Sequence, residues 1–180
     1  TQYAIKDDDA STTLVNPRNS LVQQFLVANP DGTATRLSAA SATATTTGMN
    51  PVDFGSGRGW FVDLPDLRER VNIDAKLVQG TLLVPSIVPS ATECSPGGTG
   101  WLNFFDYKTG GAVTTSGIAS GKYDAPIVGT NVLYIDGNPV VEVVTANEPT
   151  PKIDPSVDFN ATAGAFTGKR MLWRELIPQD

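Results

Sequence analysis

The sequence predicts an all-β fold with short antiparallel strands, long insertions and blades of the β-propeller type. Runs of β-branched and aromatic residues recur along the chain, separated by glycine, proline and asparagine turn signals. An aromatic strand over Trp101–Tyr107 runs into an Asp-x-x-Thr-Gly turn, which is typical of a blade corner. A weak internal repeat relates Tyr3–Asp7 to Asn103–Asp106. The pattern alone indicates part of a larger propeller, or a small sandwich.

The N-terminal half contains five segments with a predicted structure. Tyr3–Lys6 has the residues of a strand end. Ser20–Ala28 predicts a short helix, because its first residue is a good cap and its apolar residues fall at helical spacing. Thr33–Thr47, nearly all threonine, alanine and serine, favours an extended edge ribbon. Gly59–Pro65 and Glu69–Val78 predict two strands, the second from its alternation of polar and apolar residues.

The C-terminal half is dominated by hairpins. Gln79–Gly80 predicts a tight turn into a strand that begins at Thr81. Ala125–Val144 predicts a meander, since it contains two turns between strongly β-forming runs. A proline-rich linker over residues 148–155 then leads to a closing strand at Lys169–Leu176.

Composition removes several classes of function. The 180 residues carry 13 basic and 19 acidic side chains, a net charge of −6, which gives no basic footprint for nucleic acid or an anionic membrane. The absence of histidine removes the commonest general base and most zinc or copper sites. We therefore expect no enzymatic activity, no catalytic residue, no cofactor and no membrane insertion. The start at Thr1 in mid-strand predicts a piece of a longer protein.

The segment Glu93–Gly111 is the most informative part of the chain. Its glycines do not fit a phosphate-binding loop, because that loop needs a Gly-Lys-Ser/Thr ending that opens a helix. Cys94 has neither a neighbouring base nor a basic environment, so we expect a free thiol or one paired outside this chain. Asp106 is placed to accept hydrogen bonds from the turn amides, and Gly110 to supply a positive φ. These residues are expected to be structural.

Two further features have a functional and a structural interpretation. Asp7-Asp8-Asp9 carries hard oxygen ligands, but consecutive aspartates on an extended chain point apart, which favours solvated acidity over a cation site. The three tryptophans, Trp60, Trp101 and Trp173, would suit a sugar-stacking surface, but each lies within a predicted strand and is expected to pack. The residues expected to form the structural motif are Trp60, Asp63, Cys94, Gly97, Gly98, Trp101, Asp106, Gly110 and Trp173.

Several of these motifs together resemble one family. The ordered set Gly57–Pro65, Glu69–Val71 and Pro89–Gly111, with the closing Leu172–Leu176, is similar to the C-terminal propeller domain of the PilY family of type IV pilus proteins. The resemblance covers most of the chain, so residues 1–180 are interpreted as a single unit, the C-terminal portion of such a domain. The threonine-rich segment and residues 145–168 carry none of it.

The resemblance implies an exported, non-enzymatic protein of a Gram-negative bacterium. Such a protein lies in the periplasm, at the outer surface or at the pilus tip (fimbrium), assists pilus biogenesis, opposes retraction, and supports adhesion and twitching motility. Its implied partners are pilus components, such as minor pilins, and host-surface molecules. The calcium loop of the family has no clear match here, so calcium is expected only elsewhere in the longer protein.

Two other interpretations stay open. The strand-Asp-x-x-Thr-Gly turn is also found in quinoprotein-like dehydrogenase propellers, which predicts a bound quinone and dye-linked alcohol oxidation by the parent protein. A small glycan-binding β domain is the other, and it predicts glycan binding that Trp60→Ala abolishes while the fold persists.

Overall fold

The computed structural model describes residues 1–6, 16–90, 97–148, 150–154 and 157–159, and within them the all-β class is confirmed. One four-residue helix accompanies eleven strands in the described part of the chain. The elements are β1 (Gln2–Ile5), α1 (Pro17–Ser20), β2 (Val22–Ala28), β3 (Thr35–Ala39), β4 (Gly59–Val62), β5 (Lys76–Val78), β6 (Thr81–Pro89), β7 (Gly98–Asp106), β8 (Ile118–Tyr123), β9 (Ile127–Ile135), β10 (Asn138–Thr145) and β11 (Lys152–Asp154).

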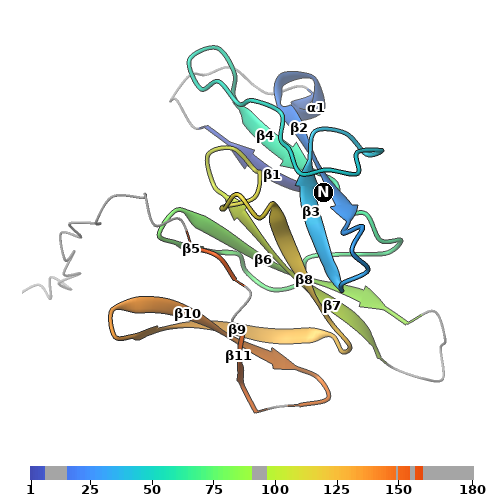
Figure 1. The fold of residues 1–180 in the computed structure, drawn as a ribbon, viewed down its shortest axis with the longest axis vertical. Helices are drawn as coiled ribbons and strands as arrows, with labels where there is room; N and C mark the ends of the chain where they lie inside the picture. The colour runs from blue at the N-terminus through green and yellow to red at the C-terminus, as the bar shows by residue number, and fades with distance from the viewer. Residues whose placement is uncertain (7–15, 91–96, 149, 155–156, 160–180) are drawn as a thin grey trace, which may run out of the picture.

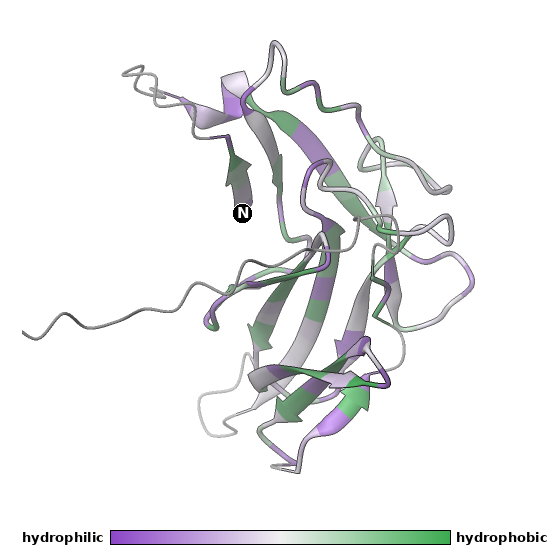
Figure 2. Ribbon diagram, turned by 90° about the vertical axis from the view of Figure 1, so that its left-hand side faces the viewer, coloured by the Kyte–Doolittle hydropathy of each residue, from purple (hydrophilic) through white to green (hydrophobic). Residues whose placement is uncertain are grey.

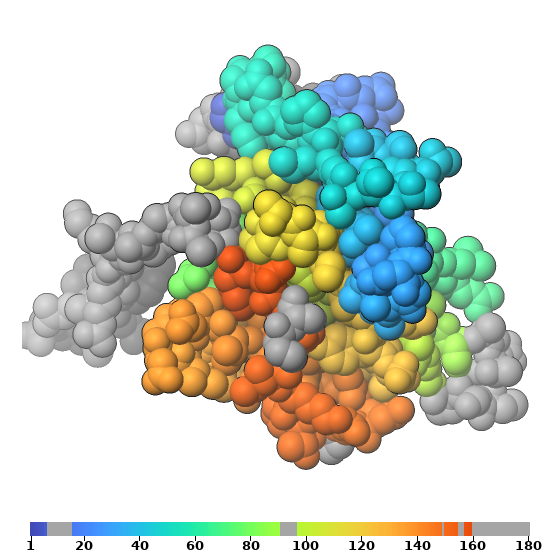
Figure 3. All heavy atoms as spheres, viewed as in Figure 1, coloured from blue at the N-terminus to red at the C-terminus, as the bar shows by residue number. Residues whose placement is uncertain are grey.

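Two sheets organise these strands. The larger sheet has eight strands in the order β1-β4-β2-β3-β8-β7-β6-β5 and curls into a half-barrel. The smaller sheet has the order β11-β10-β9 and lies across the lower ends of the long strands (Figure 1). In the space-filling view its residues, in orange, form the lower part of the face shown (Figure 3). The all-β class therefore holds for the described strands, while propeller blades are not confirmed among them.

Both faces of the β6-β7 hairpin are buried, although only β5 lies between it and one edge of the larger sheet. Leu83 and Val84 are adjacent on β6 and belong to two different hydrophobic clusters, as Phe104 and Phe105 are on β7. This follows from the two-residue period of a strand. Figure 2 shows the hydrophobic segments, in green, running along the strands of both sheets.

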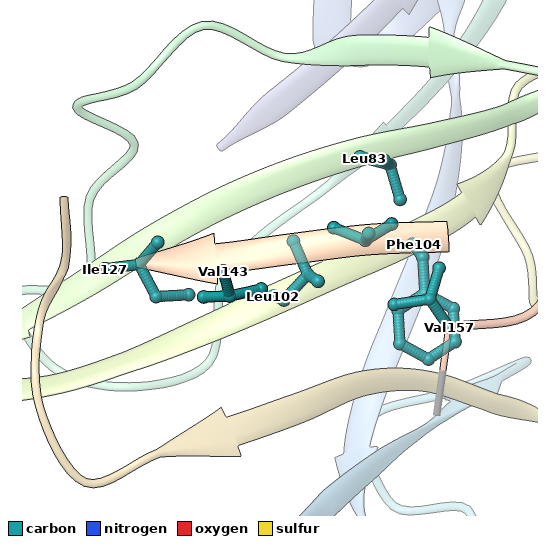
Figure 4. Close-up of a cluster of buried hydrophobic side chains, with 7 residues drawn as sticks. Leu83, Leu102, Phe104, Ile127, Val143 and Val157 are labelled. Carbon is teal, nitrogen blue, oxygen red and sulfur yellow. The ribbon is translucent and has the colours of Figure 1, made fainter. Parts of the chain in front are cut away.

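The first cluster joins the two sheets. Side chains of β6 and β7 point toward those of β9 and β10, and the segment at Val157 closes one end (Figure 4). The cluster consists of Leu83, Leu102, Phe104, Ile127, Val141, Val143 and Val157. The second cluster lies on the opposite face of the hairpin, within the curl of the larger sheet. It consists of Leu26, Trp60, Val62, Val84, Phe105 and Ala119.

The helix predicted over Ser20–Ala28 is wrong. The helix α1 lies just before it and lasts one turn, with Pro17 in its first turn and the Asn16 side chain accepting a hydrogen bond from the Arg18 amide. β2 follows instead, paired in parallel with β4 and antiparallel with β3. As an inner strand β2 has apolar or buried residues on both faces, and such a short apolar run is easily mistaken for a helical pattern.

Three other predictions of local structure need correction. The threonine-rich ribbon contains the strand β3, but this strand lies between β2 and β8 and is not an edge. The strand predicted over Glu69–Val78 forms only in its last part, as β5. Its first part does not pair as a strand, because the Glu69 side chain turns inward to Ser86 and Arg70 makes a single isolated bridge to Ile87. The expected linker over residues 148–155 contains β11. β8, which is rich in small and polar residues, was not predicted.

The tight turns agree with the sequence. Gln79-Gly80 joins β5 to β6 and Asp136-Gly137 joins β9 to β10, with both residues of each pair at positive φ. The second turn expected within Ala125–Val144 is absent, because β9 continues from Ile127 to Ile135. The closing strand predicted at Lys169–Leu176 lies outside the described residues.

Gly110 is expected to be the most sensitive glycine of the Asp106–Gly111 turn, which follows β7. Its φ is +71°, and a Cβ there would lie 2.4 Å from a ring carbon of Trp60. Gly110→Ala should lower the free energy of unfolding by about 2–5 kcal/mol, combining backbone strain with overpacking. Chemical denaturation followed by tryptophan fluorescence measures this loss.

Gly137→Ala is the matched control, since Gly137 has a φ of +80° and nothing within 4 Å of the added Cβ. It should cost only about 1–2 kcal/mol, the backbone term alone. Equal losses in the two variants would contradict a packing role for Gly110.

Candidate functional site

The Asp106–Gly111 turn has the hydrogen bonds that its sequence predicts. The Asp106 carboxylate Oδ1 accepts from the Lys108 and Thr109 amides, both at 2.9 Å, and the Gly110 amide donates to the Asp106 carbonyl at 2.8 Å. The Trp60 indole Nε1 donates to the Tyr107 carbonyl at 2.9 Å. The turn is thereby fixed to the core, which makes it a structural element.

Trp60 is fully buried and meets Phe105 edge to face, with ring centroids 5.7 Å apart. A residue in this position has no face open to a sugar ring. The glycan-binding interpretation therefore cannot depend on Trp60, and loss of binding in Trp60→Ala would only report a disturbed core.

Gln24 ties β2 to the same turn. Its side-chain amide donates to the carbonyls of Asn50 and Thr109, both at 2.7 Å, while its oxygen accepts from the Asn50 amide at 2.9 Å. The residue is 1% exposed, so these bonds satisfy a polar group that would otherwise be costly to bury. Sequence reasoning missed this role, because the partners are distant in the chain.

A buried ion pair lies on the face of the larger sheet that carries the second cluster. The Arg36 guanidinium of β3 forms two hydrogen bonds to the Glu69 carboxylate, at 3.0 and 2.8 Å, and lies 3.0 Å from Asp66. The Arg36 and Glu69 side chains are 3% and 0% exposed. Arg36 also stacks 3.7 Å from the centroid of the Trp101 ring, whose Nε1 donates to Asp66 at 2.9 Å. Trp101 is thus held by packing and by a polar partner.

The ion pair continues into a chain of buried polar groups across β6, β7 and β8. The Ser86 hydroxyl donates to Glu69 at 2.6 Å and accepts from the Asn103 side-chain Nδ2 at 3.1 Å. The Ser120 hydroxyl donates to the Asn103 side-chain Oδ1 at 2.6 Å. We name Arg36, Asp66, Glu69, Ser86, Trp101, Asn103 and Ser120 the buried polar network. Its groups satisfy one another, and this arrangement favours a structural role over chemistry.

Asp63 lies at the surface beside α1. Its carboxylate accepts from Arg18 at 2.6 and 2.9 Å and from the Thr1 hydroxyl. The hydrogen bond from Arg18 lowers the pKa of Asp63, and the same bond raises the pKa of Arg18. The Arg18 guanidinium also lies over the Phe61 ring at 4.8 Å. The pair joins α1 to the end of β4.

The remaining predicted motif residues are separate from these groups. Gly98 begins β7 opposite Pro89, at a φ of +139°, and Gly97 precedes it in an exposed position. Cys94, Trp173 and the Asp7-Asp8-Asp9 run lie outside the described residues. Among the residues that the structure describes, no three His, Cys, Asp or Glu side chains are placed to share a metal ion.

A polar pocket opens between the β8-β9 turn and the β10-β11 segment. Its volume is about 400 Å³, within the range of about 300–1,000 Å³ that small-molecule sites occupy. The Tyr123 hydroxyl donates to Asp154, and burial together with this bond raises the pKa of Tyr123 well above its usual range. The polar pocket is lined by Lys122, Tyr123, Asp124, Ala125, Val143, Thr145, Asn147, Glu148, Thr150 and Lys152.

An apolar groove of about 380 Å³ lies between β1 and the β5-β6 hairpin, at the two edges of the larger sheet. Leu77 and Tyr107 are 56% and 40% exposed on its walls. It is lined by Gln2, Tyr3, Ala4, Ile5, Lys6, Phe54, Leu77, Leu82 and Tyr107. The apolar groove was not predicted, because it is assembled from segments that are far apart in the sequence. The polar pocket was not predicted either, because only the folding of β8, β10 and β11 brings its lining residues together.

Comparison of the chain with protein-family models, with curated proteins and with solved structures finds no match. The search for membrane spans finds no helix of sufficient length and hydrophobicity in the described part of the chain.

Tyr123 is expected to make the folded state sensitive to alkali. Below pH of about 10, the ordinary value for tyrosine, the phenol is protonated in both the folded and unfolded chains. Above it the unfolded chain releases the proton while the folded chain retains it, so stability falls as the pH rises, by up to about 1.4 kcal/mol per pH unit. Urea unfolding between pH 8 and 11 measures this slope.

Tyr123→Phe should reduce the alkaline slope, because it removes the titrating group. Tyr134→Phe, at a tyrosine that is 61% exposed, is the control and should leave the slope as it is. A slope that persists unchanged in Tyr123→Phe would contradict this assignment.

Proposed function

We propose that the chain belongs to an exported, non-enzymatic protein that serves type IV pilus assembly and surface attachment through protein contacts. The observation that carries the proposal is the ordered set of motifs similar to the PilY family, over Gly57–Pro65, Glu69–Val71 and Pro89–Gly111. The proposal includes the finer architecture, in which this chain is the C-terminal portion of a β-propeller.

The positions of these motifs in the fold support their use as a signature. Trp60, from the first motif, packs against Phe105 and the Gly110 turn, which belong to the third. Glu69, from the second, binds Ser86 and Arg36 in the buried polar network that also holds Trp101. Motifs separated by tens of residues thus meet in one core. This is expected if these residues specify a domain and not a reaction.

The partners proposed are minor pilins and host-surface molecules, and the proposed place is the periplasm, the outer surface or the pilus tip. Among the concave surfaces of the described residues, the apolar groove and the polar pocket are open to such contacts. The proposal assigns no cofactor to this chain, since the motif residues are engaged in packing and in structural hydrogen bonds.

Deletion of the parent gene tests the proposal. We expect fewer surface pili, smaller twitching zones and weaker adhesion, each restored by the wild-type gene. A gene carrying Gly137→Ala should restore all three, while one carrying Gly110→Ala should not, because only the second disturbs the Trp60 core. Pilus counts by electron microscopy and twitching zones on agar give the readouts.

Unchanged piliation, motility and adhesion in the deletion strain would overturn the proposal. The proposal would also be overturned, in favour of the quinoprotein interpretation, if the purified parent protein contained a bound quinone and oxidised alcohols in a dye-linked assay.

A further inference from the structure

The polar pocket has no excess of cationic side chains. Among its lining residues, Lys152 is cationic and Asp124 and Glu148 are anionic. Lys152 is paired with Glu148, whereas the Lys122 ammonium lies 5.7 Å from the centroid of the Trp101 ring, on the opposite face of β8 from Tyr123. A phosphate or a polyanion needs an excess of cationic donors, and a metal ion needs several oxygen ligands, which Asp124 alone does not supply. The lining therefore favours a ligand with no net charge.

The neutral part of the lining offers hydrogen bonds of both kinds. Asn147 has an amide that donates and accepts, and the hydroxyls of Thr145 and Thr150 do the same. The carboxylates of Asp124 and Glu148 accept, and the Lys152 ammonium donates. A dense set of donors and acceptors around one cavity suits a ligand that carries several hydroxyl groups.

The floor of the polar pocket is less polar. Ala125 and Val143 are buried, and Tyr123 is the aromatic residue of the lining. The hydrogen bond from Tyr123 to Asp154 holds the tyrosine in place and keeps its hydroxyl protonated. An amphipathic aromatic residue beside convergent polar groups gives a ligand with apolar C–H faces and hydroxyl edges a partner for each.

We propose that the polar pocket binds a neutral carbohydrate, of the size of a mono- or disaccharide. The site lies between the β8-β9 turn and the β10-β11 segment and includes no tryptophan, so it differs from the Trp60 surface considered from the sequence. The inference does not depend on the pilus proposal, because it follows from the lining residues alone.

Saturation-transfer NMR and titration calorimetry on the 180-residue chain test this site. The probes are the methyl glycosides of glucose, galactose, mannose and N-acetylglucosamine, with maltose and lactose, and inorganic phosphate as the charged comparison. We expect at least one sugar to bind and phosphate not to bind. Asn147→Ala should weaken that sugar by about tenfold, the effect of losing one hydrogen bond to a bound ligand.

Asn131→Ala is the matched control. Asn131 is an exposed residue of β9 outside the lining, so its replacement should leave sugar affinity unchanged. Asp124→Asn tests the lining a second time and should also weaken binding, while thermal unfolding verifies that each variant is folded. The proposal is overturned if no sugar of the panel binds, if phosphate binds in preference, or if Asn147→Ala and Asn131→Ala affect affinity equally.

Discussion

The pairing of Arg36 with Glu69 is the interaction on which the larger sheet depends. Arg36 lies on an inner strand, and Glu69 comes from the connection that precedes β5, so the pair fixes this connection against β3, β6 and β7. Removing both charges from water is expensive, and the cost is offset only when every lone pair and proton finds a partner. Asp66, Ser86 and the face of Trp101 supply these partners.

The Arg36–Glu69 pair, with the groups around it, helps to explain how the β6-β7 hairpin of the larger sheet can be buried on both faces. The outward face of the β6-β7 hairpin is covered by the three-stranded sheet, whose side chains complete the first cluster (Figure 4). The inward face holds the second cluster at one end, around Trp60, and the buried polar network farther along the same strands. The curl of the sheet brings β2 and β4 over this face, and Gln24 connects β2 to the Asp106–Gly111 turn.

Local signals predicted the local features, and tertiary contacts decided the rest. The turns at Gln79-Gly80 and Asp136-Gly137, and the Asp106 turn, were predictable because their residue types directly specify the backbone geometry. β2 was mistaken for a helix and Glu69 was assigned to a strand, because each is determined by partners far away in the chain. The lining of the polar pocket carries no continuous sequence pattern.

A double-mutant cycle between Arg36 and Glu69 tests the central claim most directly. The free energies of unfolding of Arg36→Met, Glu69→Leu and the double variant are measured in urea and compared with the wild type. Arg36→Met leaves the buried Glu69 carboxylate without its cation and should lose about 3–5 kcal/mol. Glu69→Leu leaves Arg36 paired with Asp66 alone and should lose less, while the double variant should lose much less than the sum of the two. A coupling energy of at least about 2 kcal/mol is predicted. Additive losses, within about 0.5 kcal/mol, would show that the pair does not hold the sheet together.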